Sequence, residues 1–183
     1  MGDPKKARKK YSRPRSPWRA DQLAQELYLL GTFGLRNKRE LWKAQTKLSS
    51  VRKQARTLLA ATEQVRLREE RKLLESLRRR GLVAEGATLD DILSLTVEDV
   101  LARRLQTMVF KKGMALSPLH SRQLIVHGHV HVRDRVITVP GYEVGHDEEA
   151  GVKLSEYKGG TVPTPAPEVA KAEAPAEQAP TAK

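Results

Sequence analysis

The stretch HSRQLIVHGHVHVRDRVITVPGY, residues 120–142, constrains the fold most, because its hydrophobic period changes partway along. Before Gly128 the apolar residues have helical spacing, and a glycine at that place is typical of a helix end. After it come two runs that alternate between apolar and polar residues, 129–133 and 136–139. Such alternation is typical of strands with one buried face, and we expect a tight turn at 134–135, although no glycine supplies positive φ there. The segment predicts a helix followed by a small antiparallel sheet.

Helical spacing also dominates the chain between residues 21 and 112. The predicted helices are 21–31, 37–60, 63–80, 97–112 and 117–127. Asn37 and Ser117 are suitable N-caps, and Glu40 occupies the reciprocal position of a capping box. The first helix has a predicted buried stripe of leucines, Leu23, Leu27 and Leu30. Edge strands are expected at 142–144 and 152–154.

These patterns predict an α+β fold built from four parts. The last part is rich in alanine, proline and glutamate and has no aromatic residue, so it cannot form a core and is expected to be disordered. The predicted parts are a basic extended arm (1–20), a helical domain (21–100), a two-helix module with a small antiparallel sheet (101–160) and the tail (161–183).

The charge indicates a polyanionic partner. The chain has 34 Lys and Arg against 22 Asp and Glu, a net charge of +12. Such an excess favours nucleic acid first and an anionic membrane surface second. No apolar run is long enough to span a membrane, and the absence of cysteine excludes disulfides and thiolate zinc sites. We therefore expect a soluble, intracellular protein without a membrane partner.

The N-terminal arm concentrates this charge. Lys9, Lys10 and Arg13 lie among prolines, which prevent a helix and suit an extended segment that becomes ordered along phosphates. Tyr11 or Trp18 is available for stacking on bases. The alternative is a solvated tail or a localisation signal.

The helices are predicted to present basic and polar faces as well. Lys38 and Arg39 start the cationic face of the second helix, and Arg104 and Lys111, seven residues apart, are predicted to share one face of the fourth. The last helix places three polar side chains on one face, His120, Gln123 and His127. These groups suit phosphates and ribose hydroxyls, whereas a solvated surface is the alternative.

The histidine cluster is also a candidate metal site. His129 and His131 would point to the same side of a strand, with His127 close by. The chain has no cysteine, and Arg133 and Arg135 lie next to the nearest carboxylate, so their charges oppose a divalent cation. The sequence also lacks catalytic and nucleotide-binding motifs. We therefore expect no metal, no cofactor and no catalytic residue.

Three blocks, 28–45, 97–115 and 120–144, resemble the universal small-subunit ribosomal protein S-four family, in its archaeal and eukaryotic branch. The last two resemble the S-four RNA-binding module. The resemblance implies RNA contacts through Arg103, Arg104, Lys111, Ser117, Ser121, Arg122, Gln123, His127, Gly128, His129 and Arg133, beside the basic residues Lys9, Lys10, Arg13, Lys38 and Arg39. Replacing Arg104 and Arg122 with alanine is expected to weaken RNA binding without unfolding the protein. Bacterial relatives have Asn-Gly at the hairpin where this chain has Arg133 and Asp134.

The family implies a structural, non-enzymatic protein of the small ribosomal subunit in the cytoplasm. It would be a primary binder of ribosomal RNA that nucleates assembly of the subunit body and contributes to translational accuracy. Neighbouring small-subunit proteins, and messenger RNA where it enters the subunit, are further expected partners, and no homo-oligomer is expected. The alternatives are an RNA-modifying enzyme or a general nucleic-acid-binding protein that uses the same module.

Overall fold

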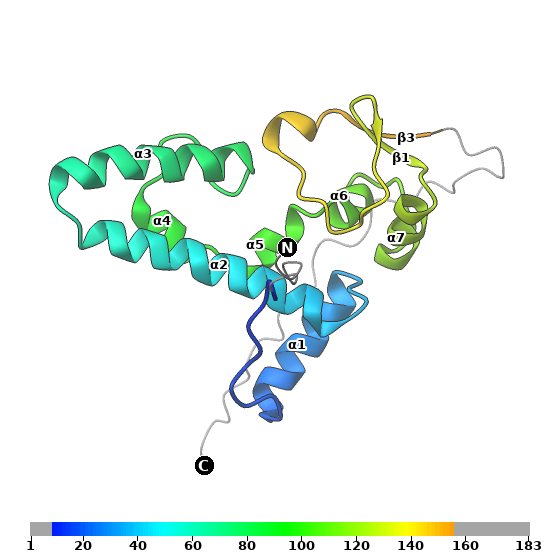
Figure 1. The fold of residues 1–183 in the computed structure, drawn as a ribbon. Coiled ribbons are helices and arrows are strands. Elements are labelled where there is room, and N and C mark those ends of the chain that lie inside the picture. Colours follow the sequence, from blue (N-terminus) through cyan, green and yellow to red (C-terminus); the bar gives the residue numbers. More distant parts are fainter. Residues whose placement is uncertain (1–8, 156–183) are drawn as a thin grey trace, which may run out of the picture.

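The computed structural model describes residues 9–155, and the first eight residues of the arm and the predicted tail at 161–183 lie outside the described residues. Its elements confirm the predicted α+β class (Figure 1). In chain order they are α1 (Ala20–Thr32), α2 (Lys38–Leu59), α3 (Glu63–Arg79), α4 (Leu89–Ser94), α5 (Val97–Ala102), α6 (Leu105–Lys111), α7 (Pro118–Val126), β1 (Val130–Val132), β2 (Arg135–Val136), the 3-10 helix η1 (His146–Glu148) and β3 (Val152–Leu154).

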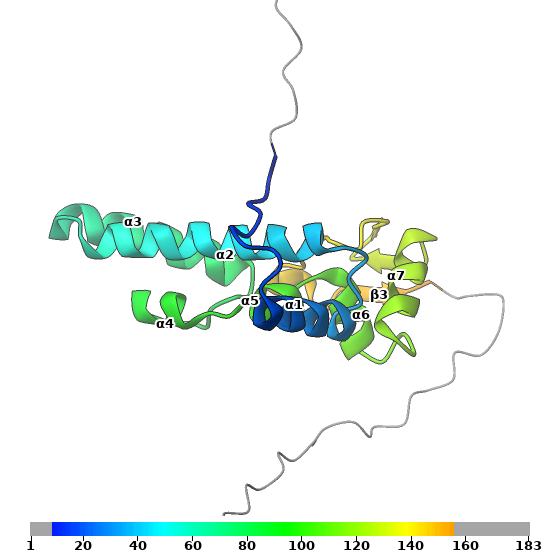
Figure 2. The same cartoon turned by 90° about the horizontal axis from the view of Figure 1, so that it is seen from below.

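The helical half, residues 20–102, is built around α2. This helix contacts α1, α3, α4 and α5, and Figure 2 shows α1 and α4 on the same side of it. One stripe of α2 is buried, with Leu41 and Leu48 packed against Leu101 of α5. Further along, Ala55 packs with Leu77 of α3 and with α4. Burial of a leucine contributes about 1.5–3 kcal/mol, so these two clusters account for much of what holds the short helices in place.

The first helix buries a residue that was not expected. Leu27 was predicted to face inward, but 56% of its surface is exposed, whereas Leu23 and Leu30 are half-buried and Leu30 packs against the core. In α1 the buried position belongs to Glu26, whose carboxylate accepts a hydrogen bond from Trp42 Nε1 at 3.1 Å and pairs with Lys38 at 3.1 Å. The stripe prediction was wrong for Leu27, because the paired carboxylate of Glu26 occupies the buried position of this helix.

The predicted helix 97–112 is in fact two helices, α5 and α6. Between them Arg104 is extended, with φ −73° and ψ 142°. The backbone there pairs with a distant segment: Leu105 N–H donates to the Tyr142 carbonyl at 2.8 Å, and Val144 N–H donates to the Arg103 carbonyl at 3.0 Å. The predicted edge strand at 142–144 is reduced to a single isolated bridge, residue 104 with 143. Long-range backbone hydrogen bonds therefore end a helix that local sequence favours.

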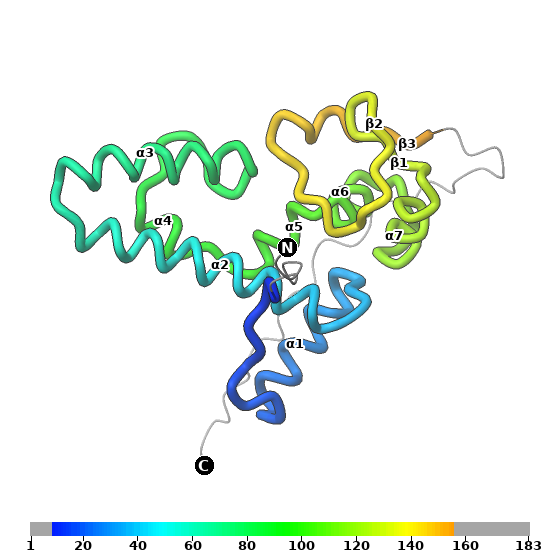
Figure 3. The backbone as a smooth tube through the Cα atoms, viewed as in Figure 1, coloured from blue at the N-terminus to red at the C-terminus, as the bar shows by residue number. Residues whose placement is uncertain are grey.

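The C-terminal half, residues 103–155, packs α6 and α7 against each other and against a three-stranded antiparallel sheet of order β2-β1-β3. Val130 and Val132 point from β1 into a core shared with α6, α7 and β3. The chain leaves β2 and passes α6 before it turns to η1 (Figure 3). This half thus has its own apolar core.

The predicted hairpin forms, but its turn lies one residue earlier than the expected 134–135, and β2 is shorter than expected. Val132 pairs with Arg135, so Arg133 and Asp134 form a two-residue turn. Arg133 itself takes the positive φ, 55°, that a glycine or asparagine usually supplies. Its N–H donates to the Gly151 carbonyl at 2.8 Å. This hydrogen bond fixes the turn against the residue that precedes β3. The predicted third strand is confirmed as β3.

Candidate nucleic-acid interface

Three side chains that are distant in sequence meet where the two halves join. Glu40, in the first turn of α2, accepts hydrogen bonds from Arg104 Nη2 at 2.6 Å and from Arg122 Nη2 at 2.9 Å. The exposed fractions of these side chains are 18%, 9% and 21% in that order. We refer to Glu40, Arg104 and Arg122 as the Glu40 junction. One carboxylate here holds two arginines of the C-terminal half against the helical half.

The electrostatics of the junction favour an ionised Glu40. Burial by itself raises the pKa of this carboxyl, but hydrogen bonds and charge from Arg122 and Arg104 outweigh burial and lower the pKa below its ordinary value. Its backbone N–H is capped by Asn37 Oδ1 at 3.2 Å, as predicted for an N-cap. A capping box would have the Glu40 carboxylate accept a hydrogen bond from the Asn37 backbone N–H. The carboxylate accepts hydrogen bonds from the two arginines instead. The junction is therefore charged at neutral pH.

Buried polar groups next to the junction fix α7 to the helical half. Gln106 is 1% exposed, and its amide nitrogen donates to the carbonyls of Gly34 at 2.8 Å and Pro118 at 2.9 Å. Ser121 is fully buried, and its hydroxyl donates to the Pro118 carbonyl at 2.7 Å. Gly34 has φ +56°, and an added Cβ would lie 2.7 Å from the Pro118 side chain. A side chain at position 34 would collide with the start of α7, so only glycine fits there.

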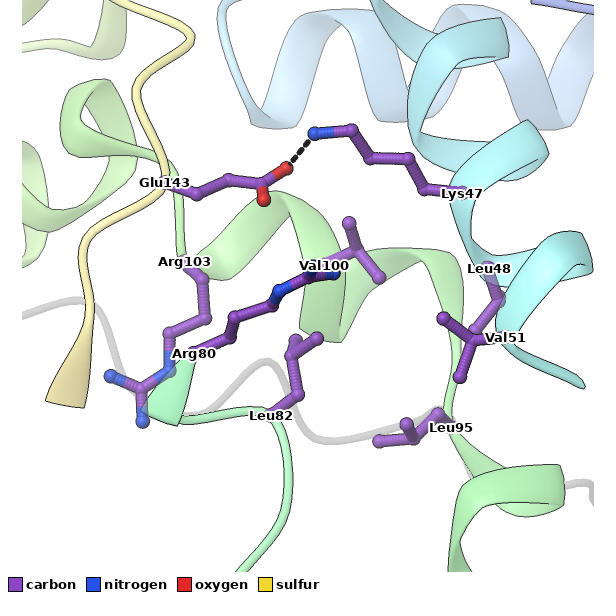
Figure 4. A pocket seen from close by; sticks show the side chains of 9 residues that line it. All are labelled: Lys47, Leu48, Val51, Arg80, Leu82, Leu95, Val100, Arg103 and Glu143. Atoms are coloured by element: carbon purple, nitrogen blue, oxygen red, sulfur yellow. Dashed lines mark hydrogen bonds and ion pairs between the residues drawn. The ribbon is translucent and has the colours of Figure 1, made fainter. Parts of the chain in front are cut away.

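Arg103 forms a second connection between the halves. Its Nε donates to the Gly81 carbonyl at 2.6 Å, and Nη1 pairs with Glu149 at 2.6 Å. Gly81 has φ +66°, and a Cβ there would lie 2.5 Å from Arg103 Cζ. Figure 4 shows Arg103 beside an apolar pocket whose rim carries the ion pair of Lys47 and Glu143. Arginines 103, 104 and 122 therefore all have protein partners.

The predicted RNA-facing residues divide by exposure. Exposed are Lys9, Lys10, Arg13, Arg39, Lys111, Gln123, His127 and Arg133. Half-buried are Lys38, Arg103, Ser117, Arg122, Gly128 and His129. Buried are Arg104 and Ser121. RNA contact by these residues stays a prediction. The shared helical face expected for Arg104 and Lys111 does not form, because Arg104 is the extended, buried N-cap of α6 and lies outside its helical turns. Ser117 is the N-cap of α7, as predicted.

The described part of the arm runs along α2. Ser12 N–H donates to Thr46 Oγ1 at 3.0 Å, and the Tyr11 ring stacks on Trp42 with centroids 5.9 Å apart. Tyr11, predicted as available for bases, is thus already stacked within the protein. Trp18 is 88% exposed. The arm places Lys9 over the Tyr11 ring at 4.8 Å.

Two histidines of the candidate metal cluster, His127 and His129, stack with ring centroids 6.4 Å apart. Residues 9–155 hold no group of three or more His, Cys, Asp or Glu side chains placed to bind a metal ion. Between the same two positions, no helix has the length and hydrophobicity needed to cross a bilayer.

Sequence reasoning missed the importance of Glu40 and Gln106. Glu40 was interpreted as a cap, since its arginine partners lie 64 and 82 residues further along the chain. The sequence did offer one indication for Gln106, which is a polar residue in a largely apolar run. Such a residue is either exposed or hydrogen-bonded, and here it is fully hydrogen-bonded inside.

Comparison with known proteins covers both halves. Residues 5–102 match the ribosomal protein S4/S9 N-terminal domain, and residues 103–149 match the S4 domain. Three similar proteins carry the name small ribosomal subunit protein uS4. That of Ignicoccus hospitalis is 55% identical over 81% of this chain and 90% of its own length. Those of Cenarchaeum symbiosum and Hyperthermus butylicus are each 54% identical, over 85% and 81% of this chain and 76% and 85% of their own lengths. This chain therefore belongs to the family of small ribosomal subunit protein uS4.

Proposed function

We propose that the chain is a structural protein of the small ribosomal subunit that binds ribosomal RNA. The family membership supports this proposal most directly. The net charge of +12 agrees with it, because a surplus of this size on a small protein attracts a polyanion. The comparisons do not support the two alternatives, an RNA-modifying enzyme and a general nucleic-acid-binding protein. Residues 5–102, where an RNA-modifying enzyme would need a catalytic domain, match a ribosomal domain instead.

The proposed mechanism is positioning. Exposed cations would contact phosphates, with Lys111 and Arg133 on the C-terminal half and Arg39 on the helical half. Gln123 and His127 would bond to ribose or phosphate oxygens. The role of Arg103, Arg104 and Arg122 would be indirect. They hold the two halves in one relative orientation, and the exposed cations therefore form a fixed pattern. A rigid pattern binds folded RNA with less loss of conformational freedom.

The finer parts of the proposal concern the role in the ribosome. We infer a primary RNA binder that nucleates assembly of the subunit body and contributes to accuracy where messenger RNA enters. Neighbouring small-subunit proteins are proposed partners, in the cytoplasm, with a single copy of this chain in each subunit. The division of RNA contacts among the arm (1–20), the helical part (21–100) and the module (101–160) belongs to the same proposal.

Sedimentation of cell lysate tests the class. The protein should migrate with small subunits on a sucrose gradient even after a high-salt wash. Such a wash removes proteins that are held by phosphate contacts alone, because affinity from those contacts falls steeply with salt. Competition binding then tests the ligand. A small-subunit RNA transcript should displace labelled RNA at far lower concentration than duplex DNA of equal length. Equal competition by duplex DNA would refute the proposal.

A further inference from the structure

The outward side of α1 is apolar and uncovered by the rest of residues 9–155. Leu27 is 56% exposed and Tyr28 is 68% exposed, and the small residues Ala20, Ala24 and Gly31 are exposed on the same helix. Figure 1 shows α1 projecting from α2 at the lower edge of the molecule. The helix therefore has a second apolar side besides the one that packs against α2.

The spacing of this side is typical of a helix that pairs with another helix. Ala20, Ala24, Leu27 and Gly31 follow one another at intervals of four, three and four residues. Such intervals place residues in one line along a helix, and side chains of a second helix can insert between them. The two alanines and the glycine allow close approach, and a Cβ at Gly31 would meet no atom within 4 Å. This line of residues, which we call the α1 seam, thus fits a helix better than an extended peptide.

The charges around the α1 seam disfavour RNA as its occupant. Between Arg19 and Arg36 the chain has no basic residue, although it has 34 Lys and Arg in all. The carboxylate of Asp21 is exposed beside the seam and forms no hydrogen bond or ion pair with the described residues. A phosphate here would meet a carboxylate and no cation. A protein helix with an apolar stripe and a basic side chain opposite Asp21 complements both the seam and its charge.

A second copy of the chain fits the α1 seam poorly. Each copy has a net charge of +12, so two copies repel each other. The helix has 13 residues and is about 20 Å long, so one side of it buries far less than the ~1,200 Å² of a stable interface between free proteins. The occupant must therefore already be held close to α1, as another component of the same particle would be.

We propose that the α1 seam is a docking surface for an amphipathic helix of a neighbouring protein in the small ribosomal subunit. The inference rests on the proposed function, because assembly into a subunit brings that neighbour close. Leu27 and Tyr28 would be the main contacts, since a few large side chains supply most of the binding energy of an interface. Asp21 would pair with a Lys or Arg of the neighbour. The protein would thus use its basic surfaces for RNA and this uncharged one for protein.

A matched pair of leucines tests the surface. Leu27 and Leu67 have nearly equal exposure, 56% and 52%, but Leu67 lies on α3. Each glutamate variant is expressed in its own cells beside tagged wild type, and the ratio of variant to wild type in purified small subunits is measured. We expect about tenfold less Leu27→Glu than Leu67→Glu in the subunits, because the new carboxylate would be buried unpaired in the seam. Both free variants should keep the wild-type urea midpoint and the wild-type affinity for transcribed small-subunit RNA.

Crosslinking identifies the occupant. Full-length protein with the photoreactive residue p-benzoylphenylalanine in place of Tyr28 is assembled into small subunits, which are purified and irradiated. We expect a crosslink to one other protein, through a peptide with apolar residues at intervals of three and four. Asp21→Lys should lower the yield of that crosslink, because it would repel the basic side chain of the neighbour. A crosslink to RNA or to a second copy of this chain, or no crosslink at all, would overturn the inference.

Failure of this inference and failure of the proposed function are distinguishable. If tagged wild type is absent from small subunits, the proposed function fails, and the docking surface fails with it. If wild type is present and Leu27→Glu is incorporated as well as Leu67→Glu, the docking surface alone is refuted. If Leu27→Glu lowers the affinity of the free protein for the RNA transcript, α1 contacts RNA, and the inference is overturned.

Discussion

Removing the charge of Glu40 should destabilise the protein strongly. In Glu40→Gln the two guanidinium groups of Arg104 and Arg122 lose their shared counter-ion, while the side chain keeps nearly the same shape. Breaking a buried ion pair typically costs about 3–5 kcal/mol. Arg122 is 21% exposed and retains a 3.3 Å contact to Gln106 Oε1, which reduces the cost. We therefore expect a decrease of about 2–4 kcal/mol in the free energy of unfolding.

Urea unfolding at pH 7, followed by circular dichroism, measures this decrease. A slope of about 1–3 kcal/mol per molar urea predicts a midpoint lowered by about 1 M or more. Glu143→Gln is the matched control. It also removes a carboxylate paired with a basic side chain, but its partner Lys47 is 54% exposed, so the loss should be at most about 1 kcal/mol. A Glu40→Gln loss no larger than the Glu143→Gln loss would refute the structural role given to the junction.

The same pair of proteins gives a pH test. The pKa of Glu40 is lower in the folded state than in the unfolded state. The carboxylate thus contributes its full stabilisation above the unfolded-state pKa, and this contribution is lost as the pH falls through the folded-state pKa. The stability difference between wild type and Glu40→Gln should be constant near neutral pH and should shrink below about pH 4.5. A difference that grows as the pH falls would contradict this assignment.

Three further predictions concern single residues. Gly81→Ala should cost more stability than Gly86→Ala in thermal unfolding, since both have positive φ but only Gly81 has a neighbour, Arg103, in the way of a Cβ; equal losses would contradict this. Arg133→Gly should raise the unfolding free energy by up to about 1 kcal/mol by removing strain at φ 55°, and a loss would show that the arginine side chain contributes more than the strain. The hydrogen bond to Glu148, aided by burial, raises the pKa of Tyr142, so Glu148→Gln should lower the tyrosine pKa measured by NMR titration.

Local signals predicted the helix ends and the hairpin well. Asn37 caps the start of α2, and Ser117 caps α7. These interactions join residues three apart, so the sequence displays both partners together. The hairpin was also expected, but the positive φ falls on Arg133, one residue before the turn predicted at 134–135. Interactions between residues close in sequence, such as these helix caps, could therefore be predicted without a structure.

The roles of the arginines could not be read in this way. Arg104 was interpreted as a ligand-facing cation from its expected helical face, and Arg122 from the family resemblance. Their partner lies in α2. The helix break that turns Arg104 toward it depends on two backbone hydrogen bonds, from Leu105 N–H to the Tyr142 carbonyl and from Val144 N–H to the Arg103 carbonyl. The expectation that replacing both arginines leaves the fold intact conflicts with the contacts they make. In a basic protein, local sequence does not distinguish an arginine that binds RNA from one that binds the protein itself.

The position of Glu40 has a consequence for synthesis of the chain. Translation produces α2 well before residue 122, so a nascent helical half has this carboxylate solvated and unpaired. The N-terminal apolar clusters can form at that stage, because their residues all precede position 103. Docking of the later half then withdraws Glu40 from water and closes the molecule. The helical half can therefore fold first, and the relative orientation of the two halves is fixed only after the C-terminal half has been synthesised.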